Sequence, residues 1–439
     1  MRGVLAAAYA CFCVGIANGL AQDPVVVSSA TVIDGRGGPP SARTTIVIRR
    51  GRISAIGPDS LMHLPSGATV IDAHGRWVIP GLIEVHTHDF FTTKDGLKQA
   101  LALGVTTALV IGISDTVLYL QDWSDPATTA APRMYVTPGG FTGEFPDNVF
   151  PGLIRLARPA SPRDARRMVE ELHSRGATQL KIWQDDGRLW WDALQPLPTH
   201  APTVVPAIIR TAHRHGMRVY AHAWEMRYAR QLVAAGVDCL IHPIADSLAE
   251  VEFLRTLAER RMPWVTTLTG LDLFYDPATY ARRVLADPRL VATLSTDVVE
   301  GLERNTRHSD GAAHPWAHPP ALARNYRAYR ETIVRNTLAA RQAGVPLAVG
   351  SDQPMGVGTH VEMELMTESG LTPAEVLRAA SAGGARVLGL EGEVGTLVVG
   401  KRADLVVLRS NPLADIRNAR DVEWTIKGGQ RFQDGQRVP

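Results

Sequence analysis

Cysteine and lysine are both scarce in this sequence. Among 439 residues the only cysteines are Cys11, Cys13 and Cys239, and lysine supplies 5 of the 46 basic side chains. Cys11 and Cys13 lie in an apolar N-terminal segment, so removal of that segment would leave Cys239 alone and would exclude an intramolecular disulfide. In so lysine-poor a chain, a lysine within an apolar strand is conspicuous.

The sequence also lacks a strong charge of either sign. The formal net charge is +2, and no basic block is interleaved with aromatic residues, which argues against a nucleic-acid partner. Beyond the N-terminal segment no apolar run is long enough to cross a bilayer, which argues against stable membrane insertion. Hydrophobic residues make up 45% of the chain, and its length suffices for an α/β barrel with a smaller accessory domain.

The first 21 residues have the features of a secretory signal peptide. Arg2 provides a positive charge, residues 4–16 are apolar, and small residues lead up to Ala21, after which we expect cleavage. The apolar run is too short to span a bilayer comfortably, and the alternatives are an uncleaved anchor or a buried helix. We therefore expect the protein to be exported to a bacterial periplasm or secreted.

Both ends of the remaining chain are predicted to form β-structure. Residues 25–79 contain short β-branched runs separated by Gly, Pro and Asp, and residues 391–439 show the same pattern. We expect the two ends to build one accessory β-domain that flanks a central domain of residues 80–390.

The central domain alternates short apolar strands with helical stretches, which is typical of a parallel α/β fold. Helices are expected, for example, at residues 163–175, 204–215 and 227–235. Eight strands favour a closed (β/α)₈ barrel. The expected strands are residues 81–88, 105–111, 133–138, 179–183, 218–223, 239–243, 264–268 and 346–352.

Residues 272–329 form a long connection after the seventh expected strand. Long loops at the C-terminal face of a barrel often cover a site. Two interpretations stay open for this segment: a substrate lid and a solvated helical excursion. Its notable side chains are His308, His314, Trp316 and His318.

A His-x-His motif ends the first strand of the central domain. His86 and His88 are two residues apart, so they point to the same side of a strand and could hold one Zn²⁺-like ion, with a packing role as the alternative. On the fourth strand Lys181 lies between apolar residues, where a charge must be paired or removed. Lys181 could pair with Asp185 or Asp186, or it could react with CO₂ to give an anionic carbamate able to bridge two metal ions.

Three further polar residues end later strands. His222 and His242 end the fifth and sixth strands and Asp352 ends the eighth; taken singly, these could be core histidines and a capping aspartate. Taken together, six potential ligands end five strands, at the face where barrels collect catalytic residues. A centre for zinc or a similar metal explains them jointly. The six residues are His86, His88, Lys181, His222, His242 and Asp352.

These residues resemble those of the amidohydrolase superfamily, and the chain is most similar to its imidazolonepropionase-like and Xaa-Pro dipeptidase-like members. Residues 78–88 resemble the first-strand signature of the family and residues 350–352 its last-strand signature. Residues 371–375 and 395–405 are also typical. Lys181 departs from the pattern of true imidazolonepropionases, which lack the bridging lysine.

The resemblance implies a (β/α)₈ TIM barrel with a composite β-sandwich domain built from both termini. It also implies a binuclear centre for two divalent metal ions, most naturally Zn²⁺. In the implied arrangement one ion is held by His86, His88 and Asp352, the other by His222 and His242, and both by carboxylated Lys181.

From this ligand set we expect metal-activated hydroxide to cleave an amide bond in a small molecule, such as a dipeptide or an N-acyl amino acid. Asp352 would carry the proton to the leaving amine. The alternatives are a lactonase or ester hydrolase on the same centre, and a non-catalytic solute- or metal-binding protein. Fold alone does not choose among them, and homo-oligomerisation is left open.

Two further residues are candidate substrate contacts. Tyr220 lies two residues before His222 and shares its inward face, so it could position the substrate or stabilise an oxyanion, with packing as the alternative. His360 follows the eighth strand at a position that resembles one near the family's active site. Residues 395–402 nearly match a phosphate-binding loop, but Arg402 replaces the Ser or Thr that binds Mg²⁺ and a strand follows, so we expect a turn in the β-domain.

Overall fold

The computed structural model describes residues 24–112, 118, 120, 130–143, 156–189, 196–307 and 320–438. The expected signal peptide therefore lies outside the described residues. So do the four side chains singled out in the long connection, His308, His314, Trp316 and His318.

Strands from both ends of the chain form one continuous sheet, as expected. Its order is β18-β17-β16-β15-β5-β1-β2-β3, with β4 paired to β1. The junction between the two ends is the antiparallel pairing of β5 with β15. The strands are β1 (Val25–Val32), β2 (Ser41–Arg49), β3 (Arg52–Pro58), β4 (Thr69–Asp72), β5 (Trp77–Pro80), β15 (Leu405–Leu408), β16 (Val422–Lys427), β17 (Gln430–Gln433) and β18 (Gln436–Val438).

Tight hairpins and a closed edge shape this β-domain. The two-residue loop Arg50-Gly51 has positive φ at both positions, which is the type I′ geometry that suits the twist of a hairpin. The outer strand β3 then meets residues 400–403, where Ile53 N–H donates to Lys401 O over 2.9 Å. The sheet thus folds back on itself around a buried apolar core. The expected turn at residues 395–402 lies at this closure.

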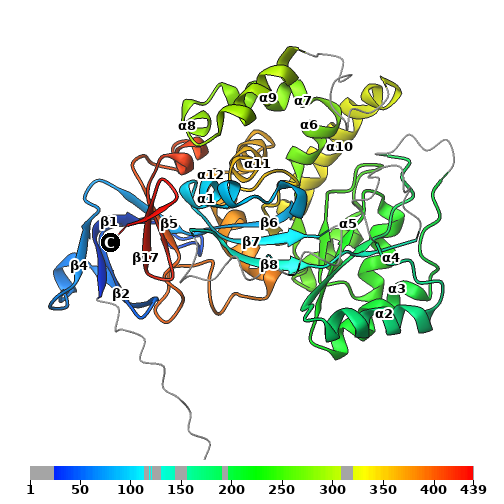
Figure 1. Cartoon of the computed structure of the whole chain (residues 1–439), viewed down its shortest axis with the longest axis horizontal. Coiled ribbons are helices and arrows are strands. Elements are labelled where there is room, and N and C mark those ends of the chain that lie inside the picture. Colours follow the sequence, from blue (N-terminus) through cyan, green and yellow to red (C-terminus); the bar gives the residue numbers. More distant parts are fainter. Residues whose placement is uncertain are drawn as a thin grey trace, which may run out of the picture.

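The central domain carries the parallel strands that the sequence predicts. β6, β7 and β8 form one sheet, and β14-β13-β12-β11-β10-β9 form another. Figure 1 shows β6, β7 and β8 running away from the β-domain. The strands are β6 (Leu82–His88), β7 (Val105–Ile111), β8 (Arg133–Thr137), β9 (Phe141–Thr142), β10 (Gln179–Trp183), β11 (Arg218–His222), β12 (Cys239–Ile241), β13 (Trp264–Val265) and β14 (Leu347–Ala348).

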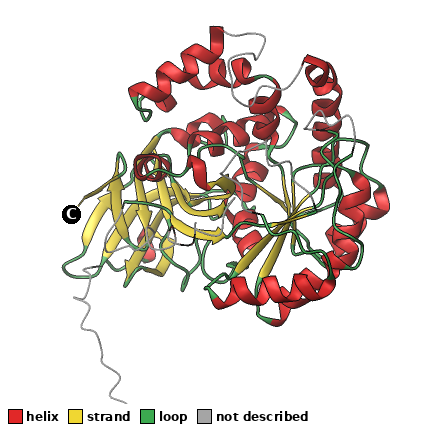
Figure 2. Ribbon diagram, turned by 45° about the vertical axis from the view of Figure 1, so that its right-hand side comes forward, coloured by secondary structure: helices red, strands yellow, loops and turns green. Residues whose placement is uncertain are grey.

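Backbone hydrogen bonds join the first strand of the central domain to the segment after its last. Val85 N–H donates to Val349 O over 3.1 Å, and Asp352 N–H donates to His86 O over 2.7 Å. At the other junction β8 packs beside β10. The fold is thus a (β/α)₈ TIM barrel with a composite β-sandwich domain (Figure 2).

Glycine is required at this closing seam. A Cβ at Gly350 would lie 2.5 Å from Val265 Cγ1 and 2.7 Å from His86 Cβ. Real side chains do not approach so closely, and only glycine lets the two strands meet here.

Three strands are shorter than expected, and a residue with left-handed backbone follows each of them within four residues. The backbone φ is 72° at His242, 38° at Thr267 and 56° at Asp352. These left-handed values are uncommon for residues other than glycine and interrupt a β ladder. The residues expected to finish strands 239–243, 264–268 and 346–352 therefore lie just beyond them. β9, only two residues long, was not expected.

The helices surround the barrel strands (Figure 2). In α2, Ser161 caps the N-terminus by accepting from Asp164 N–H, and Pro162 occupies the first turn. The three helices expected at 163–175, 204–215 and 227–235 are confirmed as α2, α3 and α4. The helices are α1 (Lys94–Ala102), α2 (Pro162–Ser174), α3 (Val204–Arg214), α4 (Met226–Ala235), α5 (Val251–Glu259), α6 (Leu268–Tyr275), α7 (Pro277–Leu285), α8 (Pro288–Val291), α9 (Thr296–Arg307), α10 (Pro320–Gln342), α11 (Val357–Glu368), α12 (Pro373–Arg378) and α13 (Gly384–Leu388).

The described part of the long connection after β13 is helical. It comprises α6 to α9 and the start of α10, and α7 to α9 lie above α1 and α11 in Figure 1. Arg283 of α7 forms ion pairs with Glu364 and Glu368 of α11, and Gln99 of α1 donates to Thr293 O over 2.9 Å. These contacts fit the helical excursion, one of the two interpretations left open for this segment.

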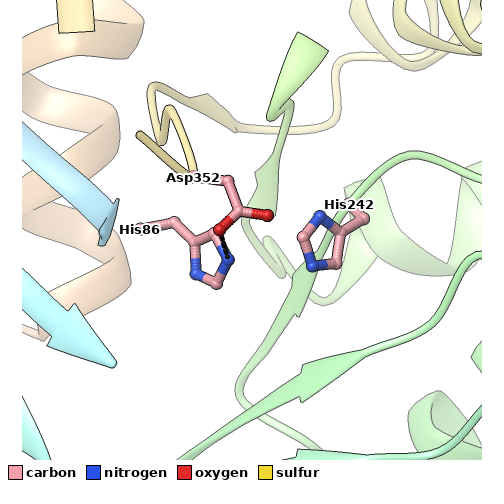
Figure 3. Close-up of side chains that lie close together, drawn as sticks. All are labelled: His86, His242 and Asp352. Atoms are coloured by element: carbon pink, nitrogen blue, oxygen red, sulfur yellow. Dashed lines mark ion pairs between the residues drawn. The ribbon is translucent and has the colours of Figure 1, made fainter. Parts of the chain in front are cut away.

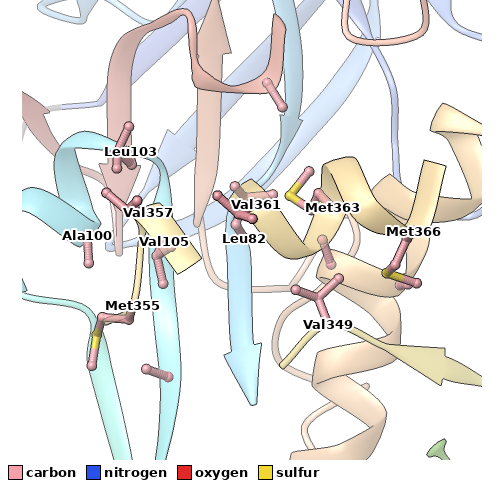
Figure 4. Close-up of a cluster of buried hydrophobic side chains, with 14 of the residues drawn as sticks. Leu82, Ala100, Leu103, Val105, Val349, Met355, Val357, Val361, Met363 and Met366 are labelled. Carbon is pink, nitrogen blue, oxygen red and sulfur yellow. The ribbon is translucent and has the colours of Figure 1, made fainter. Parts of the chain in front are cut away.

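A large apolar cluster supports the strands that lead to the candidate site. Figure 4 shows Leu82, Val105 and Val349 of the barrel wall together with Val361 and Met366 of α11. Leu82 and Val349 each precede a candidate ligand by three or four residues on the same segment. Close packing at these positions holds the strand ends in place.

In the described part of the chain, no helix combines the length and the apolar character that crossing a membrane requires.

Candidate metal centre

The strand ends bring the candidate ligands together inside the barrel. His86 and His88 are at the end of β6, Lys181 is in the middle of β10, and His222 ends β11. The ligand atoms of His86, His242 and Asp352 all lie within 4.8 Å of one another. Figure 3 shows the Asp352 carboxylate between the two imidazole rings.

Asp352 contacts both histidines of the His-x-His motif. Its Oδ1 lies 3.1 Å from His88 Nε2 and 3.4 Å from His86 Nε2. Burial opposes ionisation of this carboxyl, but the two histidines hold the pKa of Asp352 well below its ordinary value. Asp352 is therefore an anion at neutral pH, as a metal ligand must be.

The second pair of histidines faces the first. The ring centroids of His222 and His242 are 4.5 Å apart, and those of His86 and His242 are 4.9 Å apart. Burial lowers the pKa of His242 well below its usual value, and burial lowers that of His86 to about 3. Both rings are consequently neutral at neutral pH, with a lone pair available for a metal.

Hydrogen bonds fix the orientation of three of the four rings. His88 Nδ1 lies 2.9 Å from Ile111 O, which can only accept, so this nitrogen carries the proton. His242 Nδ1 lies 2.8 Å from Thr267 Oγ1, and His222 Nε2 lies 3.2 Å from Asp185 Oδ2. Partners of this kind orient metal-binding histidines and raise their basicity.

Lys181 is fully buried beside these histidines. Among the described residues its Nζ has no hydrogen-bond partner. The two aspartates that could have paired with it have other partners: Asp185 contacts His222, and Asp186 contacts Arg188 and Arg227. Burial lowers the pKa of Lys181 to about 7, although the Asp352 charge opposes this effect. The pairing that the sequence left open is thus not formed.

The donors present fit a divalent metal. With its Nδ1 donating to Ile111 O, His88 is left with Nε2 facing the Asp352 carboxylate across 3.1 Å, so both groups are placed to serve one metal ion. Neither ring nitrogen of buried His86 has a hydrogen-bond partner among the described residues. A cation among these atoms would satisfy all of them, and histidine with carboxylate is a donor set that suits zinc.

Glu84 was not singled out from the sequence, yet it links two ligand-bearing strands. Its fully buried carboxylate accepts from His86 N–H over 2.9 Å, from Ser351 N–H over 2.8 Å and from Thr359 Oγ1 over 2.8 Å. Burial raises the pKa of Glu84 to about 7, and these donors oppose the effect. An acidic residue inside an apolar strand was the one available signal.

Tyr220 and His360 have partners away from the ligands. The Tyr220 hydroxyl lies 2.5 Å from Oε1 of Gln179, the first residue of β10, whereas His222 is at the opposite end of the neighbouring strand. His360 Nε2 lies 2.8 Å from Leu103 O, just before β7 begins. Both side chains are buried and turned towards the N-terminal ends of the strands. We therefore do not propose the expected substrate contact for either residue.

Comparisons with known proteins agree with this geometry. Residues 77–432 match the amidohydrolase family. Imidazolonepropionase of Cereibacter sphaeroides is 30% identical over 402 residues, which are 88% of this chain and 93% of that protein. Ochratoxinase of Aspergillus niger is 26% identical over 276 residues, which are 62% of this chain. This match spans about half of ochratoxinase, 49% of its length.

Solved structures share the fold. A Bifidobacterium longum protein assigned as a prolidase has a TM-score of 0.74 at 27% identity, with 94% of this chain and 95% of that chain covered. A Xaa-Pro dipeptidase with bound methionine also has a TM-score of 0.74, at 20% identity, covering 94% of this chain and 100% of its own. The match to the family over most of the sequence confirms the expectation from the motifs: this chain belongs to the amidohydrolase family.

Proposed function

We propose that this chain is an exported, binuclear metal-dependent amidohydrolase that cleaves an amide bond in a small molecule. The observation that carries the proposal is the convergence of Asp352 with four histidines, near a buried Lys181 amine that has no hydrogen-bond partner among the described residues. A structural role would leave both ring nitrogens of His86 and the amine of Lys181 without a hydrogen bond inside the barrel, which is costly. Export rests on the signal-like residues 1–21.

Each candidate ligand has a place in the proposed centre. His86, His88 and Asp352 would hold one ion, and His222 with His242 the other. Lys181 would bridge them after its amine nitrogen bonds to the carbon of CO₂ and loses a proton. When bound, two divalent ions, proposed to be Zn²⁺, would polarise a substrate carbonyl and acidify a bound water.

Asp352 is the proposed proton carrier. Its Oδ1 is directed at His86 and His88, which leaves Oδ2 outside these two contacts. Oδ2 is therefore the oxygen that can take a proton as the carbonyl is attacked and pass it to the leaving amine.

The proposed substrates are a dipeptide, an N-acyl amino acid or a related small amide. Support comes from the neighbours assigned as a prolidase and a Xaa-Pro dipeptidase, and from the relatives named imidazolonepropionase and ochratoxinase. Two of the structural neighbours are assigned as enzymes that cleave a peptide bond, so dipeptides are the first choice of substrate.

The test is a panel of dipeptides, N-acyl amino acids, esters and lactones offered to the zinc-loaded protein. We expect turnover of amides, and we expect Asp352→Asn to lose about 10²- to 10⁴-fold in kcat while it keeps the melting temperature of the wild type. Metal content is measured on both proteins to separate proton transfer from metal loss. Activity restricted to esters or lactones, or an Asp352→Asn variant with wild-type kcat, would contradict the proposal.

A further inference from the structure

A cleft lies at the opposite end of the barrel from the candidate metal centre. Its volume is about 490 Å³, within the range of small-molecule sites. Its walls include Arg261, which precedes β13, and Leu347, the first residue of β14. Asp352 follows the other end of β14. The cleft is thus separate from the metal centre.

Arginine dominates the wall of this cleft. Among the described residues that line it, five are arginines and two are glutamates, so the cleft has a surplus of positive charge. The arginines are Arg36, Arg261, Arg341, Arg378 and Arg386, and the glutamates are Glu375 and Glu391.

The glutamates neutralise only part of this charge. Arg341 pairs with Glu375 over 2.7 Å, and Arg386 pairs with Glu391 over 3.4 Å. Arg36 pairs with Asp34, outside the wall. By contrast, Arg261 and Arg378 have no ion-pair partner in the described parts of the chain. Two guanidinium groups in the lining of this cleft therefore keep their capacity to bind an anion.

Part of the cleft lining consists of small apolar residues and has an unusual backbone. It includes Ala379, Ala382 and Gly383 of a π-helical turn (Ala379–Gly383) between α12 and α13. The turn packs against β14 so closely that a Cβ at Gly383 would lie 2.2 Å from Leu347 O. Such π-helical turns are rare and often occur at functional sites. The small side chains of this turn leave room for the carbon skeleton of a ligand.

We propose that this cleft binds a small organic dianion, with its charged groups on Arg261 and Arg378 and its carbon skeleton on the Ala379–Gly383 turn. The planar guanidinium matches the oxygens of phosphate, carboxylate and sulfonate groups through paired hydrogen bonds. The cleft is large enough for a small organic molecule. A singly charged or inorganic ion would therefore contact only part of its lining.

The test is isothermal titration calorimetry of the full-length, zinc-loaded protein with propane-1,3-disulfonate. Sulfonates are poor metal ligands, so the heat reports the cleft and not the metal centre. The ionic strength is held constant because salt screens these charges. Methanesulfonate is the singly charged control. Glycerol 2-phosphate and succinate then distinguish a phosphate ester from a dicarboxylate as the source of the dianion.

We expect saturable binding of the disulfonate to one site per chain. The double variant Arg261→Gln/Arg378→Gln should bind about tenfold more weakly or worse, since each lost charge-assisted bond is costly. A matched double variant of exposed arginines on α3 and α10, Arg210→Gln/Arg335→Gln, should bind as the wild type does. Equal affinity for methanesulfonate, equal weakening in both double variants, or no saturation would overturn the proposal.

Discussion

At the scale of single residues, the candidate centre is held in place by protein groups. His88, His222 and His242 are oriented through their second ring nitrogens by Ile111 O, Asp185 and Thr267. The positive φ values of His242, Thr267 and Asp352 add strain that persists only where the surroundings enforce it. Strain and orientation together argue that this geometry serves the ligands and not the packing of the barrel.

Glu84 provides a prediction at this scale. Glu84→Gln keeps the shape of the side chain, but an amide cannot accept all three hydrogen bonds that fix His86, Ser351 and Thr359. We expect the affinity for zinc to fall about 10- to 100-fold, as when groups that orient ligands are lost. Zinc affinity is measured by competition with a chelator dye.

A control separates this effect from a general loss of stability. Asp404 is another buried carboxylate, and it accepts from Arg133 and Gly428 N–H at the contact with the β-domain. Asp404→Asn should lower the free energy of unfolding without weakening zinc binding. If Glu84→Gln bound zinc as tightly as the wild type, Glu84 would have no positioning role.

The candidate ligands could be predicted from the sequence because each lies in or shortly after a recognisable apolar strand. Glu84 could not be assigned a role, because its partners Ser351 and Thr359 lie more than 260 residues away in the sequence. The directions of Tyr220 and His360 were also not predictable. Residue spacing gives the face of an element to which a side chain belongs, but not the end of the barrel towards which it turns.

At the scale of elements, the seam between β6 and the segment after β14 determines the geometry of the centre. His86 and Asp352 approach across this seam, and Gly350 allows the contact. The sequence predicts the strands that meet here, but the left-handed backbone of Asp352 beyond β14 is a conformation that hydrophobic patterning does not encode. Long-range hydrogen bonding selects it.

Gly350→Ala tests the seam. The new methyl group would collide with Val265 and His86, and overpacking of this kind costs about 1–3 kcal/mol. We expect a lower free energy of unfolding in urea together with weaker zinc binding, because His86 must move. Gly392→Ala is the matched control, since a Cβ there meets nothing within 4 Å. Equal behaviour of the two variants would show that the seam tolerates a side chain.

At the scale of the whole molecule, the β-domain and the barrel share buried polar contacts. Arg133 of β8 donates to Asp404, next to β15, over 2.7 Å, and Lys427 of β16 donates to Ala131 O. The Asp404 side chain is nearly inaccessible to solvent, and the Arg133 side chain is mostly buried. The composite domain could be predicted from the two β-rich ends, but these bonds between distant segments could not.

Arg133→Ala tests whether the two domains stabilise each other. Removal of the guanidinium leaves the Asp404 carboxylate buried without its ion-pair partner, at an expected cost of about 3–5 kcal/mol in the free energy of unfolding. Arg255→Ala, which removes exposed ion pairs with Glu252 and Glu259 of α5, should leave stability nearly unchanged. Comparable urea midpoints for the two variants would mean that the domain contact contributes little.

The most direct test of the central claim is the metal content of the purified protein, measured by elemental mass spectrometry for the wild type and for Lys181→Ala. We predict about two zinc-like ions per wild-type chain, as in two-metal hydrolytic centres, and a marked loss in the variant. One ion per chain, unchanged by Lys181→Ala, would contradict the account and make Lys181 a structural lysine beside a mononuclear centre.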